Sequence, residues 1–351
     1  MSISDKLLGR KSANGRPHLE AVAPAFALPG GEVRISGKGL RPQELRRPSV
    51  RFGDVEGSVL ISSDEFVIAR VPEGASGPIV VGTNGDVSNP LSIGVAVPIA
   101  DNLHPVANPA LDRDGNLYVT FSGSRGQKVP VAIFKIDTNY KVTPFLNDMM
   151  NATAIAFDRE GKMYVSSRND EAVYLVAANG TVSTYAEGMG VATGIAFDRA
   201  ENLYVGDRSG TIFKIARDRQ IFVFATLEPS VSAYHLATGP QGDLFVTGPT
   251  TSSFDSVYKI DPHGSVSVFY RGLGRPQGLA FDVEGNLYVA ASLSGRRGIV
   301  KITPHADATL QVAGNGLVGL AFAPGKSAIL ATNSAVHHIA WNIEGLPLPP
   351  A

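Results

Sequence analysis

A hairpin-like segment of about a dozen residues recurs along the chain and restricts the possible folds more than any other feature. Its clearest copies are PALDRDGNLYVT (109–120), AIAFDREGKMYVS (154–166), GIAFDRAENLYVG (194–206) and GLAFDVEGNLYVA (278–290). Two degenerate copies, HLATGPQGDLFVT and GLAFAPGKSAILA, begin at His235 and Gly319. The copies follow one another at intervals of 40 to 46 residues. A period of this length is typical of propeller blades and related repeat arrays.

The remainder of each period contains a second pair of short apolar runs. Examples are AVYLVAANG with TVSTYAEGMG, TIFKIARD with IFVFATLE, and SVYKIDPHG with SVSVFYRGLG. Each run is rich in β-branched or aromatic residues and is bounded by Gly, Asn, Asp or Pro, which indicates strands rather than helices. Four strands in each of six copies predict a six-bladed β-propeller.

Within the hairpin, each part has a predicted structural role. GLAF is the innermost strand, where small residues suit the crowded axis, and NLYV is the second strand. The Asp, Gly and Asn between them form the tight turn, in which Gly or Asn adopts a positive φ. Phe and Tyr fill the space between neighbouring blades. One hairpin is marginal alone and becomes stable by stacking on the next.

The last repeat lacks an outer strand. After AVHHIAWNI the chain ends in EGLPLPPA, whereas SIGVAVPIADNL (92–103), just before the first inner strand, resembles an outer strand. We expect this early segment to pair as the fourth strand of the last blade. Such pairing closes the ring and removes a free sheet edge.

Residues before the repeats follow a different pattern. EVRIS (32–36), SVRFG (49–53), FVIARVP (66–72) and GPIVVGT (77–83) alternate apolar and polar residues between Gly and Pro turns. Short strands over about 80 residues predict an immunoglobulin-like β-sandwich. The predicted organisation is a flexible N-terminus (1–16), this sandwich (17–95), the propeller (96–346) and a short tail (347–351).

Both parts resemble known families. VAPAFALPGGEVRISGKGL (22–40), VRFGD, VPEGASGPIVV and GDVSNPLSI resemble the IPT/TIG domain. That resemblance implies an Ig-like fold with a structural, spacing or adhesive role. Over 104–345 the GIAFD, NLYV and IFKI segments resemble the NHL-repeat and SMP-30/gluconolactonase group of six-bladed propellers. The group contains both hydrolases and binding modules, so the resemblance leaves the function open.

The face on which loops enter the inner strands is the default ligand site of a propeller. The residues immediately before those strands form a mostly neutral polar ring, and we take them as the candidate ligand-binding residues. They are Asn108, Thr153, Thr193, Tyr234 with His235, and Gln277.

The SMP-30 resemblance implies a divalent cation held by Glu, Asn and Asp on the axis. Here the segment HPVANPAL contains no Glu, Gln277 takes the place of the Asn, and the Asp has no counterpart. A hard cation such as Ca²⁺ prefers several carboxylate oxygens. We therefore expect no metal site and no cofactor, with a divalent cation only if lactonase chemistry is retained. DRDGN (112–116) lacks the spacing of an EF-hand and is interpreted as a turn.

Histidine provides an alternative catalytic hypothesis. His104 and His235, together with Asn108 and Tyr234, could converge near the mouth of the channel and carry out general acid–base catalysis. This arrangement would loosely resemble the His-dependent lyases built on similar propellers. The competing interpretation is that His235 merely packs there. His337 and His338 are adjacent on a predicted strand and point to opposite faces, which disfavours a metal pair.

Charge and composition limit the possible partners. The chain has 31 Lys and Arg against 32 Asp and Glu, and no cysteine. Basic residues around the expected mouth are interspersed with acidic ones, so we expect no nucleic-acid partner; they are Arg125, Lys128, Arg168, Arg208, Arg275, Arg296 and Arg297. No apolar run is long enough to span a membrane. No secretory signal is evident, which favours a cytoplasmic protein unless a leader has been removed.

These observations favour a non-catalytic binding or scaffold protein. The propeller would present its axial face to a small molecule, a glycan or a protein, and the Ig-like domain would act as a spacer or docking module. The alternative is an enzyme, either an SMP-30-like lactone hydrolase or a propeller lyase, acting at the mouth of the channel.

Overall fold

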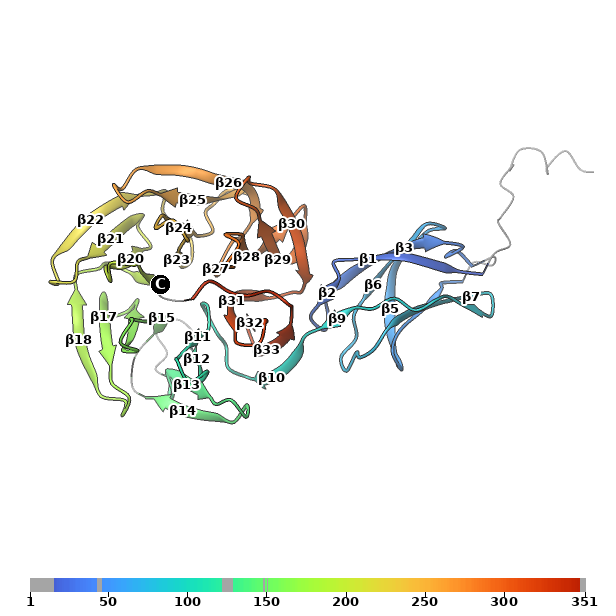
Figure 1. Cartoon of the computed structure of the whole chain (residues 1–351), viewed down its shortest axis with the longest axis horizontal. Helices are drawn as coiled ribbons and strands as arrows, with labels where there is room; N and C mark the ends of the chain where they lie inside the picture. Colours follow the sequence, from blue (N-terminus) through green and yellow to red (C-terminus); the bar gives the residue numbers. More distant parts are fainter. Residues whose placement is uncertain (1–15, 43–45, 122–128, 148, 150, 348–351) are drawn as a thin grey trace, which may run out of the picture. The chain divides into compact units, whose positions relative to one another are not determined.

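The computed structural model describes residues 16–42, 46–121, 129–147, 149 and 151–347. These residues form strands and connecting turns and contain no helix (Figure 1). The chain divides into two compact units, residues 1–95 and 96–351. Each unit is described by itself below.

The first unit is built from short antiparallel strands. They hydrogen-bond in the order β1-β3-β6-β5-β4-β7-β8, and β2 pairs in parallel with β9. Alternate residues are buried, as in Val33 and Ile35 of β3, so one face of the strands forms a core. The strands are β1 (His18–Ala23), β2 (Phe26–Ala27), β3 (Glu32–Lys38), β4 (Ser49–Phe52), β5 (Val55–Ser62), β6 (Phe66–Arg70), β7 (Ile79–Thr83), β8 (Asp86–Val87) and β9 (Gly94–Val95).

The second unit contains propeller-like blades arranged around a common centre (Figure 1). Three separate sheets have four antiparallel strands in chain order. They are formed by β11 (Ala110–Leu111), β12 (Leu117–Thr120), β13 (Ile133–Ile136) and β14 (Val142–Leu146); by β15 (Ala152–Phe157), β16 (Met163–Ser167), β17 (Ala172–Val176) and β18 (Val182–Glu187); and by β19 (Ala192–Phe197), β20 (Leu203–Asp207), β21 (Thr211–Ile215) and β22 (Ile221–Thr226).

The next eight strands form two antiparallel runs of four, β23 to β26 and β27 to β30. The two runs belong to one larger sheet because β26 also pairs with β28, with Leu273 opposite Leu293. The strands are β23 (His235–Thr238), β24 (Leu244–Thr247), β25 (Asp255–Ile260), β26 (Val266–Gly274), β27 (Leu279–Phe281), β28 (Leu287–Leu293), β29 (Arg296–Ile302) and β30 (Ala308–Ala313).

The fourth separate sheet combines both ends of the second unit. It has the order β10-β33-β32-β31, from β10 (Val97–Asp101), β31 (Leu317–Ala323), β32 (Ser327–Thr332) and β33 (Ala335–Ala340). In the antiparallel pair of β10 and β33, Val97 lies opposite His338 and Asp101 opposite Ala335. This confirms the prediction that a segment within 92–103 supplies the strand missing from the last repeat.

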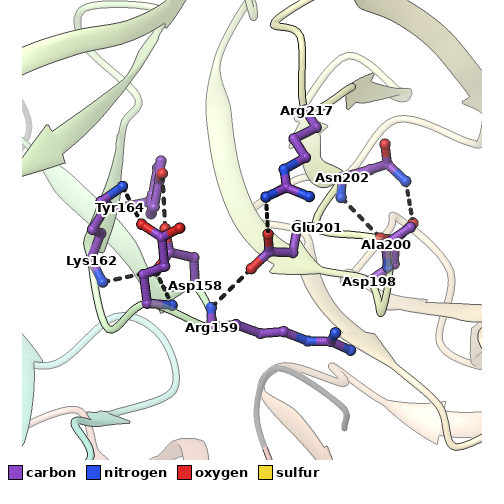
Figure 2. A network of polar contacts seen from close by, with 10 residues as sticks. Asp158, Arg159, Lys162, Tyr164, Asp198, Ala200, Glu201, Asn202 and Arg217 are labelled. Atoms are coloured by element: carbon purple, nitrogen blue, oxygen red, sulfur yellow. Dashed lines mark hydrogen bonds and ion pairs between the residues drawn. The ribbon is translucent and has the colours of Figure 1, made fainter.

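The recurring turn is organised by its aspartate. Oδ1 of Asp112 accepts the backbone N–H groups of Asp114 at 3.0 Å and Asn116 at 2.8 Å. Oδ2 accepts the Tyr118 hydroxyl at 3.2 Å. Equivalent bonds form at Asp158, Asp198 and Asp282. Figure 2 shows the bonds of Asp158 and those that join Asp198 to Ala200 and Asn202. Gly115 adopts a φ of +80°, as the turn prediction requires.

Aromatic rings join neighbouring sheets. The ring from a second strand packs edge-to-face against the Phe of the next inner strand, as for Tyr164 and Phe197, whose centroids lie 4.9 Å apart. The same contact joins Tyr118 to Phe157 and Tyr288 to Phe322. Such pairs add to the free energy already gained by burying the rings. The expectation that Phe and Tyr fill the space between sheets is therefore confirmed.

We predict that Leu103→Ala lowers the free energy of unfolding by about 2–4 kcal/mol, because it leaves a cavity in the core behind the closing strand. Leu103 is 4% exposed and packs with Leu117, Val119 and Val336. Val97→Ala on β10 is the control: Val97 is 59% exposed, so a change within about 0.5 kcal/mol is expected. Urea denaturation measures the free energy of unfolding of both variants. Equal losses would contradict a larger contribution from the side chain buried behind β10.

Candidate functional site

An axial cavity of about 600 Å³ lies inside the second unit. Its walls are the first strands of the antiparallel runs, namely β11, β15, β19, β23, β27 and β31, which we call the inner strands. The side chains along it are mostly small or apolar, such as Ala154, Ala237 and Leu279. This volume is in the range of sites for small organic ligands.

The cavity extends along the inner strands toward their C-terminal ends. Of the residues expected at the mouth, Asn108 and His235 line it. At the other end it includes Lys326 in a hairpin turn and the segment Glu344–Pro347 that follows the last strand. Lys326, Glu344 and Pro347 are exposed, so solvent reaches this end. The available volume therefore lies toward the end opposite to the expected mouth.

His235 is the titratable side chain buried in the cavity wall. It begins β23, is 4% exposed, and has no hydrogen bond from its ring to any part of the chain that the structure describes. Burial lowers its pKa to about 4, because the charged imidazolium would lose its hydration. The ring is therefore neutral at neutral pH. It offers one donor and one acceptor without a net charge.

Asn108 has a structural partner on each side of its carboxamide. Its Nδ2 donates to the carbonyl of Leu279 at 2.8 Å, and its Oδ1 accepts the N–H of Leu320 at 3.1 Å. Gly278 and Gly319 make room for it: a Cβ at Gly278 would lie 1.9 Å from Asn108 Oδ1. Asn108 therefore ties β27 and β31 to the segment that precedes β11.

Thr153, Thr193, Tyr234 and Gln277 are not among the residues that line the cavity. Three of them instead link neighbouring sheets, since their carbonyls accept bonds from hydroxyls on the preceding second strand. The donors are Thr120 at 3.5 Å to Thr153, Ser166 to Thr193, and Thr247 at 2.5 Å to Gln277. The Tyr234 hydroxyl donates to the carbonyl of Glu228, and burial raises the pKa of Tyr234.

His104 lies outside the cavity lining and is exposed. Its Nδ1 is 3.1 Å from the carbonyl oxygen of Asn333, and its ring packs edge-to-face on Phe121 with centroids 5.6 Å apart. The structure thus places His235, but not His104, in the wall of the cavity. This placement does not support a mechanism in which the two imidazole rings act as general acid and general base on one reacting atom.

The carboxylates of the hairpin turns are engaged in local bonds. Glu201 adds a link between two neighbouring turns, because its Oε1 accepts the Arg159 N–H at 3.3 Å and its Oε2 lies 3.6 Å from Arg217 (Figure 2). Where the structure describes the chain, no group of three or more His, Cys, Asp or Glu is placed to hold a metal ion. The DRDGN segment forms the predicted turn.

The basic residues considered at the sequence level are dispersed. Arg125 and Lys128 lie outside the described residues. Arg168 Nη2 donates to Asn151 Oδ1 at 3.2 Å, which holds that guanidinium against its own sheet. In the described ranges, no helix is long and apolar enough to cross a membrane.

The features missed by sequence reasoning are Lys326 and the Glu344–Pro347 segment. Two signals pointed to them. The last hairpin has Ala323 where four of the other turns have Asp, followed by Pro324 and Gly325, and the chain continues past its last strand with apolar residues and prolines. Both departures from the repeat lie at the same end of the cavity.

No protein-family model matches the sequence, and no curated protein matches it. Solved structures resemble it in fold. A gluconolactonase-like protein is 16% identical over 72% of this chain and 94% of its own, with a TM-score of 0.61. An auxiliary nutrient binding protein from Bacteroides ovatus is 13% identical over 93% of this chain and 98% of its own, with a TM-score of 0.55. Virginiamycin B lyase from Staphylococcus aureus is 14% identical over 71% of this chain and 86% of its own, with a TM-score of 0.52. At these identities the matches show a shared β-propeller fold.

We predict that His235 makes stability depend on pH. In the unfolded chain its pKa is near 6.5, and burial lowers it to about 4 in the folded protein. Below pH 6.5 the unfolded state binds a proton that the folded state does not, so stability falls as pH decreases toward 4 and then levels off. This contributes a loss of roughly 2–3 kcal/mol between pH 7 and 4.5.

The measurement is urea denaturation at several pH values for the unmodified protein and His235→Gln. Between pH 7 and 4.5, the unmodified protein should lose roughly 2–3 kcal/mol more of its free energy of unfolding than His235→Gln does. Burial also lowers the pKa of His337, but this effect is common to both proteins and cancels in the difference. His104→Gln, at an exposed position outside the cavity, serves as the control and should keep the loss of stability that burial of His235 contributes. A difference independent of pH would contradict a neutral His235.

We predict that Asp282→Asn lowers the free energy of unfolding by about 2–3 kcal/mol. Asp282 is 2% exposed and accepts the Asn286 N–H and Nδ2 at 2.8 Å and the Tyr288 hydroxyl at 3.1 Å. Bonds to a buried charged acceptor are worth more than neutral ones, and Asn can accept with one atom only. Thermal unfolding compares it with Asp114→Asn on an exposed turn, which should behave like the unmodified protein.

Proposed function

We propose that the second unit is a six-bladed β-propeller that binds a small neutral ligand in its axial cavity without catalysing a reaction. The two runs β23–β26 and β27–β30 count as two blades in addition to the four separate sheets. Two observations support counting them as separate blades. β23 and β27 both occupy the inner-strand position in the cavity wall, and the Asp turn of the repeat recurs between β27 and β28.

The observation that carries the binding role is the cavity itself. It combines about 600 Å³ of space with walls of small side chains and a neutral buried imidazole. A charged ligand beside His235 would lose hydration without an opposite charge next to it, because Lys326 and Glu344 lie at the solvent-exposed end of the cavity. A neutral ligand would displace weakly held water and gain hydrogen bonds to His235. The likeness in fold to an auxiliary nutrient binding protein is consistent with a binding role.

Lyase or lactonase activity is the second candidate, and His235 is the observation that favours it. A neutral imidazole in a dry wall can accept a proton, which is the first requirement of a general base. The fold neighbours include a lyase and a gluconolactonase-like protein. The Asp turns, however, use their carboxylates in local bonds, which leaves His235 without an obvious acidic partner.

For the first unit we propose an Ig-like fold of the IPT/TIG kind that serves as a spacer or docking module. Its alternating buried positions and antiparallel strands support this assignment. The match to the nutrient binding protein covers 93% of this chain and so extends into the first unit, which is consistent with this assignment.

We predict that the neutral dye N-phenyl-1-naphthylamine binds at one saturable site in the unmodified protein. With about 17 non-hydrogen atoms at about 0.3 kcal/mol each, its Kd is expected on the order of 0.2 mM. Ala323→Trp should weaken this binding at least tenfold, because Ala323 lines the cavity near its solvent-exposed end and a larger side chain would occupy it. Fluorescence titration measures both values.

Ala200→Trp is the matched control, since Ala200 is exposed in another hairpin turn and does not line the cavity. It should bind the dye as the unmodified protein does. Equal binding by both Trp variants would contradict the cavity as the site. If sugar lactones or virginiamycin B are converted by the protein but not by His235→Gln, the catalytic alternative replaces the proposal.

A further inference from the structure

Each inner strand pairs along one edge with the second strand of its own antiparallel run, and no regular strand among the described residues pairs with its other edge. The pairs are β11 with β12, β15 with β16, β19 with β20, β23 with β24, β27 with β28 and β31 with β32. In a β-strand, successive backbone groups point to opposite edges. Half of the N–H and C=O groups of each inner strand therefore point away from its partner, toward the cavity. An unpaired strand edge of this kind is a template for another extended chain.

The pattern of bonds in β27 shows which residues face inward. Asp282 donates its N–H to Asn286 within the hairpin, so Asp282 and the alternate residue Ala280 face β28. The carbonyls of Leu279 and Phe281 must then face the cavity. The corresponding turn bond, from the residue after the inner strand, forms at Asp158, Asp198 and Gly239. By the same alternation, Ile155, Ile195 and Leu236 face inward.

The protein already fills the inward edge of β27 with amide groups of its own. The carbonyl of Leu279 accepts the Asn108 carboxamide, and that of Phe281 accepts the N–H of Leu346 at 2.8 Å. One residue further, the Val283 N–H donates to the carbonyl of Glu344 at 3.0 Å. Together with the antiparallel bridge between Asp282 and Gly345, these bonds make residues 344–346 a short added strand.

Close packing holds this added segment against the sheets. A Cβ on Gly345 would lie 2.1 Å from Cβ of Phe322, so only glycine fits at this crossing. Leu346 packs against the core that contains Leu279 and Phe281. Extended backbone with an apolar side chain is thus compatible with the walls of this cavity.

In the part of the chain that the structure describes, the inward edges of β15, β19 and β23 carry no added strand, and the Phe197 carbonyl on β19 accepts the Thr238 hydroxyl. Within the described ranges, no hydrogen bond connects the N–H groups of Ile155, Ile195 or Leu236 to a residue outside the ladder. All three residues line the cavity and keep 6–8% of their surface exposed. Buried backbone groups need a partner, which here would be water or a ligand.

We propose that the axial cavity binds a short extended peptide, which adds as a strand to the free inward edge of β15, β19 or β23. This inference rests on the proposed binding function and specifies its ligand class. Main-chain bonds would provide affinity, as in other cases of strand addition, and the small apolar walls would select apolar, uncharged side chains. The neutral His235 would contact a polar group at one end of the peptide.

The probe is a capped tetrapeptide, acetyl-Ala-Leu-Ala-Leu-amide, titrated calorimetrically into the full-length protein. We expect one site, with binding reduced at least tenfold in Ala323→Trp and retained in Ala200→Trp. A peptide N-methylated at alternate residues keeps the backbone N–H donors along one edge, whereas a peptide N-methylated at every residue keeps only those of its C-terminal amide. The first should bind and the second should bind at least tenfold more weakly.

Amide hydrogen exchange followed by NMR provides the residue-level measurement. At saturating peptide, the amides of at least one of Ile155, Ile195 and Leu236 should exchange at least tenfold more slowly, while that of Val283, already bonded to Glu344, should not change. Equal binding of all methylated forms, or unchanged exchange at all three amides, overturns the peptide assignment. If the peptide fails while the dye still binds, the ligand class is wrong and the proposed function stands; if both fail, the binding function itself is refuted.

Discussion

The antiparallel pairing of β10 with β33 is the interaction on which the second unit depends. It joins a strand from before the first repeat to the strand that ends the last, and therefore holds together two points about 240 residues apart in the sequence. No sheet of four strands has a large core of its own, and each gains stability from the faces of its neighbours. Without the closing pair, the first and last sheets would each expose an apolar face, and the axial cavity would not be enclosed.

Closure also explains why the cavity is lined by backbone as well as by side chains. When the sheets stand around an axis, each presents its first strand edge-on, and the side chains of that strand point into the spaces between sheets. This is why Phe197, which also lines the cavity, packs its ring against Tyr164 of the neighbouring sheet. The polar groups that line the axial cavity include peptide groups, His235 and Asn108. Asn108 and the segment 344–346 satisfy some of these peptide groups, on β27 and β31, which leaves the others available to a ligand.

The local chemistry of the repeat could be predicted because it depends on neighbours in the sequence. Asp112 bonds to the backbone two and four residues later, and this geometry follows from the Asp-x-x-Gly-Asn order. The outer strand missing from the last repeat could also be predicted, because a single unmatched strand-like segment precedes the first. The position of the cavity could not. Which end of an axial channel is wide depends on how closely inner strands approach, and the direct bond between Gly278 and Val318 that closes one end joins different repeats.

The sequence by itself determined the period, the strand content, the turn aspartates and the segment that closes the ring, because each is written in residues close together or in a repeat count. Only the tertiary structure decided which polar groups reach the axis. Thr153, Thr193 and Gln277 occupy equivalent places in the repeat, yet their carbonyls are taken by hydroxyls of the preceding sheet, while His235 lines the cavity. The physical reason is that a polar group binds whichever partner folding brings within hydrogen-bond distance, and in a ring of sheets that partner comes from another repeat.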